Sequence, residues 1–416
     1  MSRSPLKIAV ISQYFHPENF IINDIVRELQ SQGHQLEVFT GKPNYPTGRF
    51  SEGYQAQGYQ LEDFAGAPVH RAPLRARQRG GAKHLLLNYL SFVWNGLRVF
   101  PPLARKSRFD VYFVFAPSPI TSVIPALGMK AFHRAPVFLW VQDLWPESLE
   151  ATGFIRNKLM LRSIGVMVRL LYKAVDVVMV QSKGFVEPVS RYVRADKIVY
   201  YPNSYLQDHP DDNPVALPES LTCLLRQRFC VVFAGNLGTA QALPTIVEAA
   251  RLLHAEGSEA RIVLVGDGSK AKWLAEQKVA LQLDNLVLAG PFARSAMAEL
   301  FELSSVLLVT LKRDEIFSYT IPSKVQAYLA AGKPIIASLD GEGARVVDAA
   351  GAGMTSSAED ASALASCIRS MQILPDDERQ RMGQNGKAYY LKHYELKTQC
   401  KKLIELFEQQ CSGDRV

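Results

Sequence analysis

The chain has 416 residues, about half of them apolar, which is enough for two domains with separate hydrophobic cores. Its five cysteines lie far apart, with no C-x-x-C pair and no nearby histidine at zinc-ligand spacing, so the sequence indicates no zinc site and favours a reducing, cytoplasmic location. The first apolar run, Ile8 to Ile11, is too short for a signal peptide, and we do not expect secretion.

The net charge of +7 comes from one part of the chain. Residues 71–109 contain nine Lys and Arg and no Asp or Glu. Removing these nine from the 47 basic residues leaves 38 against 40 acidic ones, so the rest of the chain is close to neutral.

Short apolar runs alternate with helical segments in the first half of the chain. The predicted strands are Lys7–Ser12, Leu36–Thr40, Val111–Phe115, Val137–Val141, Val177–Val180 and Ile198–Tyr201. Such alternation predicts parallel strands joined by helices that cover both faces of a sheet. We therefore expect an α/β, doubly wound domain over residues 1–207.

A linker and a second domain are expected next. Asp208–Pro218 contains three Pro and three Asp, a composition typical of linkers. The alternation then restarts with the predicted strands Cys230–Ala234, Arg261–Val265, Leu286–Ala289, Val306–Thr310 and Pro334–Ser338, which indicates a second doubly wound domain over residues 208–385. Residues 386–416 have helical periodicity, and we expect this helix to pack back on the first domain.

The segments next to these strands carry a recognisable set of motifs. They are Tyr14-Phe15-His16-Pro17-Glu18, Gly33-His34, Asp143-Leu144-Trp145-Pro146-Glu147, Gly235-Asn236-Leu237-Gly238, Gly266-Asp267-Gly268 and the block from Pro322-Ser323-Lys324 to Gly332-Lys333-Pro334. Together, over the whole chain, they resemble the GT-B glycosyltransferases of family 4, which are retaining sugar-nucleotide transferases. The resemblance is closest to bacterial O-antigen and capsule transferases that handle N-acetyl-L-fucosamine. It implies two Rossmann-like domains that face a central cleft, an N-terminal one for the acceptor and a C-terminal one for the nucleotide-sugar donor.

The first donor loop contains Gly235, Asn236, Gly238 and Thr239, after a predicted buried strand and before a helix that Pro244 opens. Closely spaced glycines bring backbone amides to a pyrophosphate, and the helix dipole adds attraction. An ordinary strand-to-helix turn is the alternative interpretation.

A second glycine turn, Gly266-Asp267-Gly268, also ends a predicted strand. With Ala271 it matches the dinucleotide-binding pattern, but no acid ends the next strand to hold a ribose. In the transferase family this turn and the following loop flank the base, so the resemblance makes Asp267 and Phe292 candidate nucleoside contacts.

The block near residue 324 is the strongest candidate for a phosphate site. Ser323 and Lys324 start a predicted helix, where free N–H groups attract anions. A lysine there faces the positive end of the helix dipole, which an anion would offset; a solvated surface lysine is the alternative.

The loop after the last predicted strand contains Gly341, Glu342, Gly343, Ala344 and Arg345. Its glycines let a ligand approach the backbone. The Glu342 carboxylate could accept hydrogen bonds from a ribose or sugar hydroxyl, and Arg345 could pair with it or with phosphate. A surface salt pair is the alternative.

The sequence departs from the broad family at several positions. The usual pair of glutamates falls at Tyr319 and Ala327, neither of which can act as an acid. The usual Arg of the phosphate loop is Asn236, the Lys shortly after it falls near Ala240 or Gln241, and the His after the fifth strand is Gln142. Lys324 is therefore expected to replace the missing donor cations.

Acceptor contacts are expected from loops of the first domain. These candidates are His16, Glu18, Asn19, Tyr45, Gln142 and Asp143. They follow predicted strands, at the positions where open α/β sheets bind ligands. Asp143 is also a candidate base for the acceptor hydroxyl, and a helix-capping role is its alternative.

The basic segment 71–109 also carries a long apolar run, Leu85 to Phe100, which polar residues interrupt too often for a membrane span. It fits an amphipathic helix on an anionic membrane surface, and a core helix with a basic exposed face is the alternative. The segment has no nucleic-acid recognition motif, so nucleic acid is not an expected partner.

The combined expectation is a glycosyltransferase peripheral to the inner face of the cytoplasmic membrane. The resemblance implies transfer from a UDP-sugar to a polyprenyl-pyrophosphate-linked saccharide during surface polysaccharide assembly, with retention and with no metal or other cofactor. A UDP-sugar 2-epimerase of the same fold and a non-catalytic nucleotide-sugar-binding module are the rival interpretations.

Overall fold

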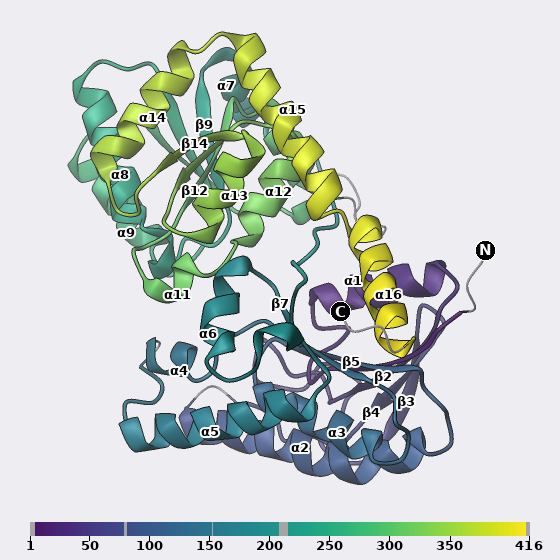
Figure 1. Cartoon of the computed structure of the whole chain (residues 1–416). Helices are drawn as coiled ribbons and strands as arrows, with labels where there is room; N and C mark the ends of the chain where they lie inside the picture. Colours follow the sequence, from purple (N-terminus) through teal and green to yellow (C-terminus); the bar gives the residue numbers. More distant parts are fainter. Residues whose placement is uncertain (1–4, 79–80, 152, 208–214, 413–416) are drawn as a thin grey trace. The chain divides into compact units, whose positions relative to one another are not determined.

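The computed structural model describes residues 5–78, 81–151, 153–207 and 215–412. The chain divides into two compact units. The first unit comprises Met1–Asn203 and Leu396–Val416, and the second comprises Ser204–Glu395. Each unit has its own sheet with helices on both faces (Figure 1).

The sheet of the first unit has eight strands in the order β3-β4-β2-β1-β5-β6-β7-β8. They are β1 (Lys7–Ile11), β2 (Gln35–Thr40), β3 (Gln60–Phe64), β4 (Ala67–Arg71), β5 (Val111–Ala116), β6 (Val137–Val141), β7 (Val177–Val180) and β8 (Ile198–Tyr200). All neighbours pair in parallel except β3 and β4, which pair antiparallel. The strand order reverses beside β1, so the loop after β1 lies at a switch point where such sheets bind ligands.

Helices cover both faces of this sheet. They are α1 (Ile21–Ser31), α2 (Ala82–Ala104), α3 (Ile124–Lys130), α4 (Glu147–Ala151), α5 (Lys158–Ala174), α6 (Val186–Ser190) and α16 (Leu396–Cys411), with the short 3₁₀ helices η1 (Ile120–Val123), η2 (Lys183–Phe185) and η3 (Ala195–Lys197). In Figure 1, α2, α3 and α5 lie on one face and α1 and α16 on the other. Phe407 of α16 packs edge-on against Phe113 and Phe138, at ring distances of 5.5 and 4.7 Å.

The sheet of the second unit has six strands in the order β11-β10-β9-β12-β13-β14, all parallel. They are β9 (Cys230–Ala234), β10 (Arg261–Val265), β11 (Leu286–Gly290), β12 (Val306–Thr310), β13 (Ile335–Ser338) and β14 (Gly353–Ser356). Here the order reverses beside β9, so the loop that begins at Gly235 lies at the switch point.

The helices of the second unit form two layers. They are α7 (Glu219–Gln227), α8 (Leu243–Ala255), α9 (Ala271–Ala280), α10 (Met297–Leu303), α11 (Glu315–Ser318), α12 (Ser323–Ala331), α13 (Glu342–Ala350), α14 (Ala361–Ile373) and α15 (Asp376–His393), with η4 (Thr239–Gln241) and η5 (Arg294–Ala296). Along β9, Val232 packs in the core with α7, α10, α12, α13 and α15, while Val231 packs in the core with α8, α9 and α14. Successive strand residues point to opposite faces, which explains why fully buried strands read as continuous apolar runs.

The predicted α/β class with two doubly wound domains is confirmed, and every predicted strand is present within one residue at each end. The strands β3, β4 and β14 were not predicted from the sequence. The first two form a hairpin with Pro68 inside β4, and β14 reads Gly-Met-Thr-Ser, so none has the apolar run that marks a central strand. The expected boundary after residue 385 falls inside α15, and the chain divides between Glu395 and Leu396 instead.

Candidate active site

Two glycine turns meet at the carboxyl end of the second sheet. The Gly235 N–H donates to the Val265 carbonyl at 2.9 Å, and the Leu237 N–H donates to the Asp267 carbonyl at 2.8 Å. A Cβ atom on Gly266 would stand only 1.9 Å from the Gly235 oxygen, and Gly266 has a φ of +136°. Only glycine fits at position 266, because a side chain would overlap the Gly235 carbonyl oxygen. The loops after β9 and β10 are therefore in direct contact and form one continuous surface.

This surface presents backbone donors. Among the described residues, the N–H groups of Asn236, Gly238 and Thr239 have no hydrogen-bond acceptor. The same holds, within the described chain, for the N–H groups of Ser323 and Lys324 at the start of α12. Such groups favour an anion, and the dipole of α12 adds to that preference.

The side chain of Lys324 connects the two sets of donors. Its Nζ donates to Oε1 of Gln241 at 2.9 Å and lies 4.7 Å from the centre of the Phe233 ring. A Cβ placed on Gly235 would be 3.0 Å from this Nζ, so the ammonium group reaches the glycine loop itself. Partial burial lowers the pKa of Lys324 to about 8, because its charged form loses hydration.

Gln241 and Phe233 were not predicted as site residues. Gln241 occupies the region where the broad family carries a lysine. Its side chain instead accepts a hydrogen bond from Lys324 of α12. Only a contact between residues 83 positions apart reveals this arrangement. The aromatic ring of Phe233 forms a cation–π contact with Lys324. The apolar run that contains Phe233 predicts only a core residue of the strand.

The Gly341 loop lies directly against the start of α12. Gly341 has a φ of +79°, and a Cβ on it would stand 2.0 Å from the Ser318 carbonyl oxygen, so this turn requires glycine. A Cβ on Gly343 would lie 3.0 Å from Cδ of Pro322. The structure thus brings Gly341 and the first turn of α13 to the start of α12, and residues 342–345, predicted as a loop, are helical.

Glu342 and Arg345 form an ion pair within the first turn of α13. Glu342 is buried, whereas Arg345 is exposed. The salt pair that the sequence left as an alternative is therefore present. One carboxylate oxygen of Glu342 is already used by Arg345.

The two predicted nucleoside contacts differ in their surroundings. Asp267 is exposed, and its Oδ1 accepts the Gly268 N–H at 2.7 Å. Phe292 is half-buried and packs against the core of the second unit. Asp267 is thus open for contact, while much of the Phe292 ring is committed to packing.

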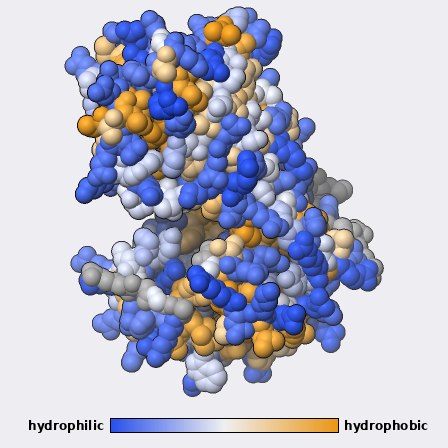
Figure 2. Space-filling view, turned by 90° about the vertical axis from the view of Figure 1, so that its left-hand side faces the viewer, coloured by the Kyte–Doolittle hydropathy of each residue, from blue (hydrophilic) through white to orange (hydrophobic). Residues whose placement is uncertain are grey.

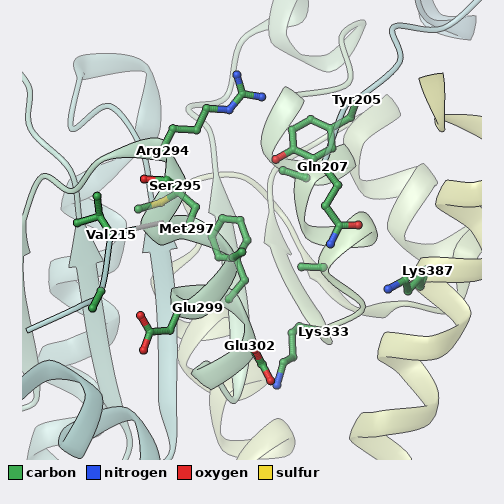
Figure 3. A pocket seen from close by; sticks show the side chains of 15 residues that line it. Tyr205, Gln207, Val215, Arg294, Ser295, Met297, Glu299, Glu302, Lys333 and Lys387 are labelled. Carbon is green, nitrogen blue, oxygen red and sulfur yellow. The ribbon is translucent and has the colours of Figure 1, made fainter. Parts of the chain in front are cut away.

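A cavity of the second unit lies elsewhere. It measures about 820 Å³ and is lined by side chains that include Arg294, Lys333, Lys387, Glu299 and Glu302 (Figure 3). Its lining includes none of the loop residues Gly235, Gly266, Ser323 and Lys324. Side chains of both signs of charge line this cavity, whereas the glycine loops present backbone donors and the Lys324 ammonium group.

In the first unit, Glu18 has a different role from the one predicted. It is only 4% exposed, and Oε1 accepts the N–H groups of Asn44 and Tyr45, each at 2.7 Å. Oε2 accepts the Phe15 N–H at 3.2 Å. The prediction that Glu18 contacts the acceptor is therefore wrong, because its carboxylate instead joins the loops after β1 and β2.

An aromatic cluster surrounds one arginine beside these loops. Tyr14, Phe20 and Tyr45 have ring centres 5.4 to 5.8 Å apart. The Arg77 guanidinium lies 5.8 Å from the Tyr14 ring centre and 5.3 Å from that of Tyr45. Tyr45, a predicted acceptor residue, is 43% exposed, so one face of this cluster is available to a ligand.

Asp143 lies near the same cluster. Its charge and that of Arg77 both act on the Tyr89 hydroxyl, and Tyr89 interacts with the hydroxyl of Tyr14. Asp143 is exposed to solvent, yet the protein atoms around its carboxyl group raise its pKa to about 6 by desolvation.

The remaining predicted acceptor residues are less tightly linked to the cluster. His16 and Asn19 are exposed on the loop after β1, and the His16 N–H donates to Oδ1 of Asn23. Nε2 of Gln142 is buried and has no hydrogen-bond partner among the described residues. Among them, no group of three His, Cys, Asp or Glu side chains has the arrangement of a metal site.

Apolar side chains are exposed on α2 and α5. Leu86, Leu90 and Trp94 of α2 are 56%, 53% and 63% exposed, and Leu159 and Leu170 of α5 are 70% and 62% exposed. Figure 2 shows apolar residues along the lower edge of the first unit, on the side where these helices lie in Figure 1. Neither helix contains an Asp or Glu. No helix in the described part of the chain is long and apolar enough to cross a membrane.

Comparisons with known proteins identify the class. Residues 19–204 match the glycosyl transferase 4-like domain, and residues 228–372 match the glycosyl transferases group 1 domain. The chain is therefore a glycosyltransferase that combines these two domain types.

Individual relatives agree with this class. A putative colanic acid biosynthesis glycosyl transferase, WcaI of Escherichia coli K12, is 25% identical over 347 residues, which are 79% of this chain and 82% of the relative. Sucrose-phosphate synthase of Thermosynechococcus elongatus superposes with a TM-score of 0.72 at 14% identity and covers 99% of this chain and 100% of its own. Anabaena HepE, solved with UDP and glucose, gives a TM-score of 0.64 at 15% identity and covers 97% and 99%. These structures have the GT-B fold, which is confirmed for this chain.

Proposed function

We propose that the protein transfers a sugar, with retention, from a UDP-sugar to a polyprenyl-pyrophosphate-linked saccharide in surface polysaccharide assembly. The observation that carries the donor half of this proposal is the position of Lys324. Its ammonium group lies over a loop of free backbone donors, which suits a diphosphate. The UDP bound to HepE and the colanic acid biosynthesis in the name of WcaI support the donor and the process by similarity.

The chemistry follows from charge development at the donor. The bond between C1 of the sugar and the β-phosphate oxygen breaks, and C1 forms a bond to the acceptor oxygen. The negative charge that grows on the departing diphosphate is stabilised by Lys324 and the loop N–H groups, so a divalent cation is not required. The acceptor proton goes to the departing phosphate or to Asp143.

The transferred sugar in this proposal is N-acetyl-L-fucosamine, because the motif set as a whole resembles the bacterial O-antigen and capsule transferases that handle this sugar. The decisive experiment is a donor screen that measures UDP release from several UDP-sugars with a lipid-linked acceptor, in buffer with EDTA. Release only with the acceptor present supports transfer. Conversion of the UDP-sugar to an epimer without acceptor would instead identify an epimerase, and donor hydrolysis or transfer above background would exclude a binding module.

The proposal includes attachment to the inner face of the cytoplasmic membrane through α2 and α5. Exposed Lys83 and Arg98 of α2 and exposed Lys158, Arg162 and Arg169 of α5 supply positive charge beside the exposed leucines. Basic residues next to interfacial Trp and Leu favour an anionic leaflet. Such attachment would bring the first unit to a lipid-linked substrate.

A further inference from the structure

A hollow of about 700 Å³ in the first unit combines a positive charge with apolar walls. Its lining residues include Tyr45, Thr47, Arg77, Leu85 and Phe154. These come from the loops after β2 and β4, the first turn of α2 and the segment before α5. The described lining contains no carboxylate.

The Arg77 backbone is fixed by buried neighbours. Its N–H donates to Oδ1 of Asn44 at 3.1 Å, and the Asn44 N–H donates in turn to the Glu18 carboxylate at 2.7 Å. Asn44 is 1% exposed and Glu18 is 4% exposed. Arg77 therefore projects from a rigid part of the fold, which lowers the entropy lost when it binds a ligand.

The guanidinium group of Arg77 has no acidic partner in the described part of the chain. Two aromatic rings, Tyr14 and Tyr45, hold it within 5.8 Å of their centres but accept none of its N–H groups. Its planar fork of N–H donors suits two oxygens of a phosphate at once. An aromatic clamp around a cation with unused donors, at the wall of a hollow, indicates an anion site.

Exposed apolar residues adjoin two lining residues, Leu85 and Phe154, along the sequence. Phe154 is 41% exposed, and Leu86, Leu159 and Met160 nearby in the sequence are 56%, 70% and 52% exposed. A ligand that places an anion at Arg77 can lay a hydrocarbon chain against Phe154 and Leu85. The hollow thus suits an anionic head joined to an apolar tail.

We infer that this hollow binds the diphosphate group of the lipid-linked acceptor, with Arg77 on the phosphate oxygens and Phe154 and Leu85 against the first isoprenoid units. This inference rests on the proposed function. A phospholipid headgroup has similar chemistry, but the exposed Arg75 and Arg98 are open to such headgroups without a hollow. The Arg77 guanidinium group, held between two aromatic rings at the wall of a cavity, favours the diphosphate.

Binding of farnesyl diphosphate, inorganic pyrophosphate and farnesol to the full chain tests the inference by titration calorimetry. Arg77→Ala is expected to weaken farnesyl diphosphate and pyrophosphate at least 10-fold, since charged hydrogen bonds are lost. Arg75→Ala, an exposed arginine two residues away, is the matched control and should change the Kd less than about twofold. Phe154→Ser should weaken farnesyl diphosphate roughly threefold to 10-fold and leave pyrophosphate unchanged.

Several outcomes would overturn the inference. They are no binding of farnesyl diphosphate to the unaltered protein, equal effects of Arg77→Ala and Arg75→Ala, or loss of flotation with phosphatidylglycerol vesicles in Arg77→Ala while farnesyl diphosphate still binds. If Arg77→Ala does not fold, Arg77→Lys supplies the comparison, with a loss between those of the control and of alanine. Diphosphate binding that depends on Arg77, without UDP release from any donor, would leave this site standing and reject the proposed function.

Discussion

Lys324 Nζ donates a hydrogen bond of 2.9 Å to the Gln241 side chain, so an ammonium group from the start of α12 lies beside the loop that follows β9. The same Nζ would be 3.0 Å from a Cβ at position 235. One residue therefore supplies positive charge where the broad family would use cations from the loop itself. This relationship makes Lys324 the first target for mutation.

Lys324→Ala should lower turnover roughly 30-fold to 1000-fold. The physical reason is the loss of about 2 to 4 kcal/mol of charge stabilisation on the departing diphosphate. Initial rates of UDP release measure the effect. Lys272→Ala is the control, because that side chain is 91% exposed on α9. Near-normal turnover in folded Lys324→Ala would contradict the role of Lys324 in stabilising the departing diphosphate.

The activity should fall at alkaline pH. Because burial lowers the pKa of Lys324 to about 8, the amine loses its proton as the pH rises through 8, and the phosphate site loses its charge. The kcat/KM for the donor should therefore drop about 10-fold per pH unit above that value. Arginine stays protonated in this pH range, so Lys324→Arg should remove the alkaline decrease in kcat/KM. A decrease that is unchanged in this variant would show that another group causes it.

The acid limb should depend on Asp143. Desolvation raises the pKa of its carboxyl group to about 6, so the carboxylate that can accept a proton is lost as the pH falls through that range. Asp143→Asn should lower kcat/KM for the acceptor about 100-fold or more and flatten this limb. A variant with normal turnover would leave the departing phosphate as the proton acceptor.

Glu18→Gln should destabilise the first unit by about 2 to 3 kcal/mol. The amide replaces a buried carboxylate that accepts three backbone N–H groups, and its NH₂ would face donors instead of accepting from them. Chemical denaturation followed by circular dichroism measures the change, with the exposed Glu52→Gln as the control. Equal stability of the two variants would contradict the role of Glu18 in joining the loops.

Membrane attachment should depend on the exposed face of α2. Changing both Leu90 and Trp94 to Ser removes apolar area that would be buried in the interface, so binding to phosphatidylglycerol vesicles should weaken roughly 10-fold to 100-fold. Flotation measures the bound fraction. Val279→Ser together with Leu391→Ser, both exposed in the second unit, is the matched control, and equal flotation of the two double variants would exclude this surface.

Much of the site was predictable from sequence because glycine turns after apolar runs leave a local signal. Gly235, Gly266 and Gly341 were found in this way, whereas Ser323 and Lys324 were found from the start of a predicted helix. The structure brings these loops and this helix start to one region of the second unit. Residues whose role depends on distant partners were missed. Arg77 was assigned only to a basic surface, since nothing local indicates that Tyr14 and Tyr45 enclose it.

The sequence by itself determined the α/β class, the strands with continuous apolar runs and the loops that carry chemistry. Fully buried parallel strands must be apolar along their whole length, and turns between strand and helix need glycine, so both leave marks within a few residues. Tertiary structure decided how each polar side chain is used. It turned Glu18 inward to bind backbone N–H groups, brought Lys324 to Gln241, and placed Arg77 at a hollow, because hydrogen bonds and charges act over a few ångströms in space, whatever their separation along the chain.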